Sequence, residues 1–162
     1  MNMQNHYWNT LVQLKHDQNY VDLFLSRSTK VNNSINLFTA LVSSSSIAGW
    51  AIWQRLSILW SIIIVTSQVI NAIKDYLPYS KRVKNLTDIY IKLADLFNRM
   101  DFYWYDISNG NMTEEDIHAK LYEFRSERDK LDSRTIGNQN LPDSGRIRNK
   151  ALELTRKYFL NY

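Results

Sequence analysis

Three histidines and two clusters of charged residues are the side chains of this 162-residue chain that could take part in chemistry. His6, His16 and His118 are scattered, and none lies at a spacing that would bind a metal ion. The acidic run at 114–116 is typical of the first turn of a helix, where carboxylates interact favourably with the helix dipole. We therefore expect no metal, no cofactor and no catalytic residue, and the chain is not predicted to be an enzyme.

Other kinds of active site are also missing from the sequence. The chain has no cysteine, which excludes a thiol nucleophile, a cysteine-based zinc site and a disulfide framework. No glycine-rich phosphate loop follows a strand, and no segment is a convincing strand. One type of ribonuclease needs an arginine and a histidine a few residues apart on one helix, and the sequence does not supply that pair.

The basic cluster near the C-terminus has two interpretations. It consists of Arg146, Arg148, Lys150, Arg156 and Lys157. These residues could form a solvated face or contact lipid headgroups, or they could bind an anionic ligand such as a nucleotide. The aromatic block at 102–105 could then offer faces for base stacking, although such blocks more often belong to a core.

The stretch from Val31 to Ile73 contains a single charged residue and is the longest mostly uncharged part of the chain. Arg55 is the only residue in it with an ionisable side chain, and it lies near the middle. The segments Ile35–Ile52 and Leu56–Ile73 supply 18 residues each, and a transmembrane helix needs about 20 mostly apolar residues. The sequence therefore predicts a transmembrane helical hairpin. The alternative, a hairpin buried in a soluble domain, is favoured by the serines at 43–46.

The distribution of basic residues predicts the orientation of this hairpin. They flank both ends of the hairpin: Lys15, Arg27 and Lys30 before it, and Lys74, Lys81, Arg82, Lys84 and Lys92 after it, whereas Arg55 alone lies at the tip. Because basic residues accumulate on the cytoplasmic side, we expect a multi-pass membrane protein with both termini in the cytoplasm.

Polar residues recur at helical spacing along both predicted spans. Together with one isoleucine they form a candidate pore lining: Thr39, Ser43, Ser46, Ser57, Ser61, Ile64, Gln68 and Asn71. Polar groups in hydrocarbon need a partner or water. Two spans could seal these faces against each other, or several hairpins could surround a pore, which would require a homo-oligomer. The residues alone leave both interpretations open.

The rest of the chain is predicted to be helical. Helical periodicity indicates further helices over 5–30, 81–107, 113–134 and 146–162, with a turn at 108–111 and a polar loop at 137–145. The predicted fold is thus an oligomeric all-α membrane protein. Its parts are an N-terminal cytoplasmic or interfacial helix (1–34), the hairpin (35–73) and a cytoplasmic helical region (74–162).

The pattern of Leu37–Ala48, Trp60–Ile73 and Tyr79–Leu96 resembles the SLATT family of two-span effectors in bacterial antiphage defence. The resemblance implies an oligomeric pore that disrupts the inner membrane and causes abortive growth arrest. It also implies gating by a nucleotide or oligonucleotide from a partner nucleotidyltransferase. The expected partners are therefore further copies of the chain, the lipid bilayer and that ligand. A second hypothesis is a non-conducting membrane anchor or scaffold that recruits a cytoplasmic protein.

Overall fold

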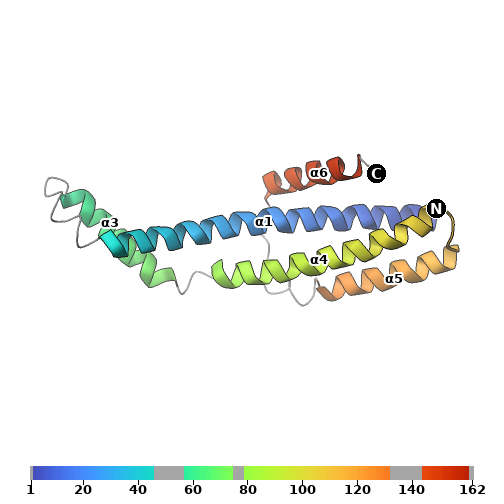
Figure 1. Ribbon diagram of the computed structural model, residues 1–162, viewed down its shortest axis with the longest axis horizontal. Helices are drawn as coiled ribbons and strands as arrows, with labels where there is room; N and C mark the ends of the chain where they lie inside the picture. The colour runs from blue at the N-terminus through green and yellow to red at the C-terminus, as the bar shows by residue number, and fades with distance from the viewer. Residues whose placement is uncertain (1, 46–56, 75–78, 132–143, 161–162) are drawn as a thin grey trace. The chain divides into compact units, whose positions relative to one another are not determined.

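The computed structural model is helical in each part of the chain that it describes, which comprises residues 2–45, 57–74, 79–131 and 144–160 (Figure 1). Its helices are α1 (Met3–Ser45), α3 (Ser57–Lys74), α4 (Tyr79–Ser108), α5 (Glu114–Leu131) and α6 (Gly145–Phe159). The chain divides into two compact units. Unit 1 comprises Met1–Leu25 and Asn85–Tyr162, and unit 2 comprises Ser26–Lys84.

Unit 1 is a helical bundle in which each helix buries one stripe of side chains. The first part of α1 buries Tyr7, Leu11, Leu14, Val21 and Phe24, at the steps of three, four and seven that keep residues on one side of a helix. The matching stripe of α4 consists of Leu86, Ile89, Leu93, Leu96, Phe97, Met100 and Ile107. Together with residues of α5 and α6, these side chains form one continuous core.

The connection between α4 and α5 shows how local chemistry sets the helix ends. Gly110 has φ 73°, a left-handed conformation that glycine adopts without steric cost, and it follows the last residue of α4 closely. Thr113 precedes α5, and its hydroxyl accepts a hydrogen bond from the backbone N–H of Asp116 at 3.2 Å. This cap fixes the start of α5, which then buries Ile117, Leu121 and Phe124.

The buried residues of unit 2 differ in kind from those of unit 1. It contains the end of α1, all of α3 and the first residues of α4. Among the side chains that the structure describes in unit 2, only Ser28 and Ser67 are buried. The large apolar side chains that are described in this unit are therefore half-buried or exposed, whereas many of those in unit 1 are buried.

The all-helical prediction is confirmed, but the predicted membrane hairpin is wrong. None of the helices within the described residues is both long enough and apolar enough to cross a membrane. At about 1.5 Å per residue, α3 measures roughly 27 Å, and it includes Ser67, Gln68 and Asn71. The hydrocarbon core of a bilayer is about 30 Å thick. The prediction relied on the absence of charge and gave too little importance to these polar residues.

The predicted location changes with the hairpin. A multi-pass protein of the inner membrane, with both termini in the cytoplasm, requires membrane-crossing helices that the described residues do not provide. That prediction is therefore also wrong. The tip of the predicted hairpin, including Arg55, and the predicted loop at 137–145 lie mainly outside the described residues.

Helix boundaries were predicted unevenly. The expected helices over 81–107, 113–134 and 146–162 correspond to α4, α5 and α6. The expected break between an N-terminal helix ending at residue 30 and a span starting at Ile35 does not exist, because α1 continues from Met3 to Ser45. The polar residues between 26 and 34 contain neither proline nor glycine, so nothing in them interrupts a helix.

Candidate functional site

An exposed row of apolar side chains distinguishes α3. This α3 apolar face consists of Ile58, Leu59, Ile62, Val65 and Val69, which are between 51% and 77% exposed. The positions 58, 62, 65 and 69 follow steps of four, three and four, so these side chains lie on one side of the helix. No charged residue occurs in α3 before Lys74 at its end.

The residues of the candidate pore lining differ in their exposure. Ser61, Ile64 and Gln68 are exposed, and Thr39 and Asn71 are half-buried. The hydroxyl oxygen of Thr39 is buried and has no hydrogen-bond partner among the described residues. Nothing is described of the side chains of Ser43 and Ser57, and Ser46 lies outside the described residues. Their role as a pore lining stays a prediction.

The basic residues predicted to bind an anionic ligand lie on the exposed part of α6. Its members Arg146, Arg148, Lys150, Arg156 and Lys157 are all exposed. The other side of the helix buries Ile147, Ala151 and Thr155 against unit 1. Lys150 forms a loose ion pair with Glu153 at 3.9 Å, on the exposed side of the same helix. We refer to the five basic residues as the α6 basic face.

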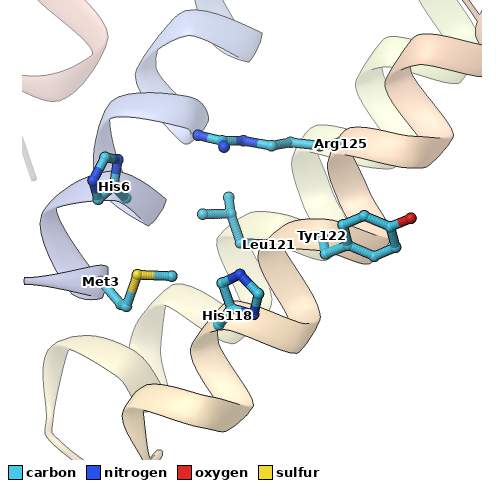
Figure 2. A pocket seen from close by; sticks show the side chains of 6 residues that line it. All are labelled: Met3, His6, His118, Leu121, Tyr122 and Arg125. Carbon is cyan, nitrogen blue, oxygen red and sulfur yellow. The ribbon is translucent and has the colours of Figure 1, made fainter.

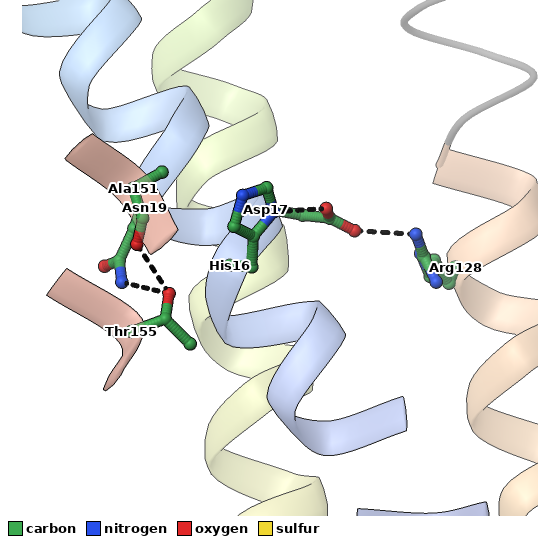
Figure 3. A network of polar contacts seen from close by, with 6 residues as sticks. All are labelled: His16, Asp17, Asn19, Arg128, Ala151 and Thr155. Atoms are coloured by element: carbon green, nitrogen blue, oxygen red, sulfur yellow. Dashed lines mark hydrogen bonds and ion pairs between the residues drawn. The ribbon is translucent and has the colours of Figure 1, made fainter. Parts of the chain in front are cut away.

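Polar contacts fix α6 and α5 against α1 (Figure 3). The amide of Asn19 donates a 3.0 Å hydrogen bond to the hydroxyl of Thr155, which in turn donates to the carbonyl of Ala151 at 2.8 Å. On the other side of α1, Arg128 of α5 donates to the carboxylate of Asp17 at 2.6 Å. These contacts hold the α6 basic face in a defined orientation on the bundle.

Lys15 joins three helices of unit 1. Its ammonium group lies 4.5 Å from the ring centre of Phe97 on α4 and 4.3 Å from that of Tyr158 on α6. Burial lowers the pKa of Lys15, against the opposing effects of Asp101 and Asp22. Because the aromatic faces attract the cation, Lys15 acts as a structural contact between helices.

The aromatic block at 102–105 divides between core and surface. Tyr103 and Trp104 pack against the core, and the ring centre of Trp104 lies 4.8 Å from that of Trp8. Phe102 and Tyr105 are exposed beside a hollow that also includes Asp101 and Asp106. Two acidic residues at this hollow disfavour a polyanion, so the stacking role proposed for the block gains no support.

A pocket between α1 and α5 brings together side chains that sequence analysis treated as scattered (Figure 2). Its volume is about 280 Å³. The residues that line it are Met3 and His6 of α1 and His118, Leu121, Tyr122 and Arg125 of α5. His6 and His118 are 112 positions apart in sequence, so only the packing of α5 on α1 could reveal their common site. Along α5, the spacing of His118, Tyr122 and Arg125 by four and three was the available signal.

Metal binding receives no support from this arrangement. Within the described ranges, the structure contains no group of three or more histidine, aspartate or glutamate residues that could hold a metal ion.

Comparison of the chain with models of protein families, with curated proteins and with solved structures gave no match. Functional inference therefore depends on the surfaces described above.

Proposed function

We propose that the chain is a homo-oligomeric helical effector in which unit 2 provides the assembly surface and unit 1 receives an anionic signal. The α3 apolar face carries this proposal. Its five large apolar side chains are exposed on a single chain, and clustered exposure of that kind marks an interaction surface in proteins. Burying them against another chain would remove this apolar area from water.

A second copy of the same chain is the occupant that the face fits best. The steps of four, three and four along α3 are those at which side chains of two helices interlock. The face has no charge of either sign, so two identical faces meet without electrostatic repulsion and no oppositely charged partner is required. Most oligomers of one chain are symmetric, and a twofold axis brings the same patch of both copies together.

The pore is not part of this proposal. A pore made of hairpins requires helices that cross the membrane, and the described helices do not meet that requirement. A scaffold role without a membrane anchor is compatible with this proposal, because an oligomer would present several copies of unit 1.

The signal is proposed to be a nucleotide or oligonucleotide. Five exposed basic side chains on one helix can bind several phosphates at once, and they are held on the bundle by buried residues of the opposite side of α6. The resemblance to SLATT effectors supplies the expected source, a partner nucleotidyltransferase. Assembly and signal recognition would then belong to separate units of the chain.

The assembly proposal can be tested with a matched pair of substitutions. Ile62 on the α3 apolar face and Ile91 on α4 are both 58% exposed, so aspartate at either position is solvated in the monomer. We expect the wild-type chain and Ile91→Asp to be oligomers by light scattering after gel filtration. Ile62→Asp should be a monomer, because a carboxylate would be buried in the interface without a partner.

Two outcomes would overturn the assembly proposal. A wild-type chain that stays monomeric at every concentration has no self-association through α3. Dissociation of Ile91→Asp to the same extent as Ile62→Asp would place the interface elsewhere or reflect a general effect of added charge. Val65→Asp, one turn further along the same face, should repeat the result of Ile62→Asp.

A further inference from the structure

The pocket between α1 and α5 has an unusual set of polar side chains. Two imidazoles, from His6 and His118, and the guanidinium of Arg125 line it (Figure 2). None of its six lining residues is acidic. Imidazole and guanidinium groups donate hydrogen bonds, and guanidinium carries a fixed positive charge. Donors of this kind converging from two helices suit a compact anion with several acceptor oxygens.

The guanidinium of Arg125 is held in place within the protein itself. Arg125 extends from α5 towards α1 and donates to the hydroxyl of Thr10 at 3.1 Å. That hydroxyl donates in turn to the backbone carbonyl of His6 at 2.9 Å. Buried neighbours fix both helices beneath the pocket, because Tyr7 adjoins His6 and Ile117 adjoins His118. Binding would therefore require little rearrangement of the two helices, which lowers its entropic cost.

An aromatic side chain lies beside the donors. Tyr122 is 71% exposed and lines the pocket. Tyr122 and Arg125 also line an adjoining hollow of about 550 Å³ with Ser126, Asp129 and Lys130. Tyr122 and Arg125 are thus shared by the two hollows. A planar base can stack on such a ring.

We infer that this pocket binds a mononucleotide, with its phosphate on His6, His118 and Arg125 and its base on the ring of Tyr122. The pocket volume is just below the range of about 300–1,000 Å³ in which small-molecule sites are usually found. The adjoining hollow provides the further room that a base needs. The site is separate from the α6 basic face and does not depend on self-association through α3.

The first test follows the histidine rings of the full-length chain by NMR. The probes are inorganic phosphate, adenosine 5′-monophosphate and adenosine. We expect the phosphate and the monophosphate to shift the ring signals of His6 and His118 in a saturable manner. Adenosine should have little effect. His16 is an internal control, because it lies outside the pocket and pairs with Asp17.

Substitutions then separate the phosphate contacts from the base contact. We expect His118→Gln and Arg125→Gln each to weaken binding of the monophosphate about tenfold, the effect of losing one charge-assisted hydrogen bond. His16→Gln should bind like the wild-type chain. Tyr122→Leu should weaken binding of the monophosphate but not that of inorganic phosphate, because phosphate has no base to stack.

The inference would be overturned by any of three results. The ring signals of His6 and His118 could fail to saturate, or His16 could respond as strongly as they do. Adenosine could bind as well as its monophosphate.

Because His118 is exposed, loss of fold is not expected in His118→Gln, and circular dichroism checks this. The NMR titration of the wild-type chain tests the site without any substitution, and light scattering reports self-association separately.

Discussion

Unit 1 and unit 2 are built from the same kind of secondary structure but bury it to different extents. In unit 1, each helix presents an apolar stripe to a common core, with side chains such as Leu11 and Met100 almost fully buried. In unit 2, α3, the most apolar of the described helices, leaves Ile58 and Val65 largely in water. Helix formation alone therefore does not stabilise a unit, since most helical stability comes from packing of the apolar face.

The helices of unit 1 are also joined by specific polar contacts. Ion pairs connect separate helices of unit 1, as between Asp17 and Arg128 or between Arg99 and Glu127. The side chain of Tyr7 adds a hydrogen bond from α1 to α4. Such contacts define which helices pair in unit 1, whereas the α3 apolar face exposes large apolar side chains on a single chain. That exposure is why we propose the assembly role for unit 2.

The largest expected effect comes from truncating matched leucines in the two units. Leu96 is 1% exposed in the core of unit 1, and Leu59 is 51% exposed on the α3 apolar face. We expect Leu96→Ala to lower the free energy of unfolding of unit 1 by about 2–5 kcal/mol, through lost burial and a residual cavity. Leu59→Ala should leave that free energy unchanged. Hydrogen exchange of the α4 amides measures unit 1 specifically.

Equal destabilisation by the two leucine substitutions would contradict the comparison. It would mean that the α3 apolar face contributes to the folding of unit 1, so that the free energies of unfolding of the two units are coupled. A small effect of Leu96→Ala, under about 1 kcal/mol, would instead mean that the core collapses around the missing methyl groups.

Periodic burial was the part of the fold that the sequence predicted well. Helical periodicity located α4, α5 and α6, and the apolar stripe of α4 that includes Leu86, Leu93 and Met100 is buried. Helix ends were predicted where a strong local signal exists, as at Thr113, whose hydroxyl caps α5. Local chemistry acts over a few residues and is therefore visible in the sequence.

The membrane hairpin shows where the same approach failed. Absence of charge along α3 was treated as a sign of lipid, but an uncharged face that binds another protein has the same sequence pattern. The pocket of His6, His118 and Arg125 was missed for another reason. Its donors come from helices that are distant in sequence, and a single sequence does not show which helices pack side by side.

A smaller effect is expected from removing one buried hydroxyl of unit 1. The hydroxyl of Tyr7 is buried and donates to the carbonyl of Met100 at 2.9 Å. We expect Tyr7→Phe to lower the free energy of unfolding by about 1 kcal/mol, because the carbonyl keeps its bond within α4. Chemical denaturation at neutral pH measures this difference from the wild-type chain.

The same substitution tests the pH dependence of unit 1. Burial raises the pKa of the Tyr7 phenol, and the nearby Tyr103, Asp101 and Glu123 raise it further. In the unfolded chain the phenol ionises near pH 10, so above that pH unfolding releases a proton. The stabilisation is therefore complete below about pH 10 and is lost above it. The difference between wild type and Tyr7→Phe should shrink there, and an unchanged difference would contradict the assigned environment.

The smallest effect on stability is expected at the α6 basic face. Arg146 and Arg148 are exposed, so the double charge reversal Arg146→Glu and Arg148→Glu should change the free energy of unfolding by no more than about 0.5 kcal/mol. Its effect on ligand binding should be large. We expect a labelled single-stranded oligonucleotide to bind the wild-type chain, measured by fluorescence anisotropy, and to bind the variant far more weakly.

The salt dependence of that binding shows whether the two arginines contact phosphates. Each phosphate contact releases counterions, so the logarithm of affinity falls with the logarithm of salt concentration by about 0.7 per contact on a single strand. The variant should have a shallower slope than the wild-type chain. Lys81→Glu with Lys84→Glu is the matched control, because both lysines are exposed and the change in net charge is the same. If the control loses binding as fully as the variant, net charge and not the α6 basic face attracts the oligonucleotide. If the arginine variant binds normally, α6 is not the site of signal recognition, and assembly through α3 is unaffected by that result.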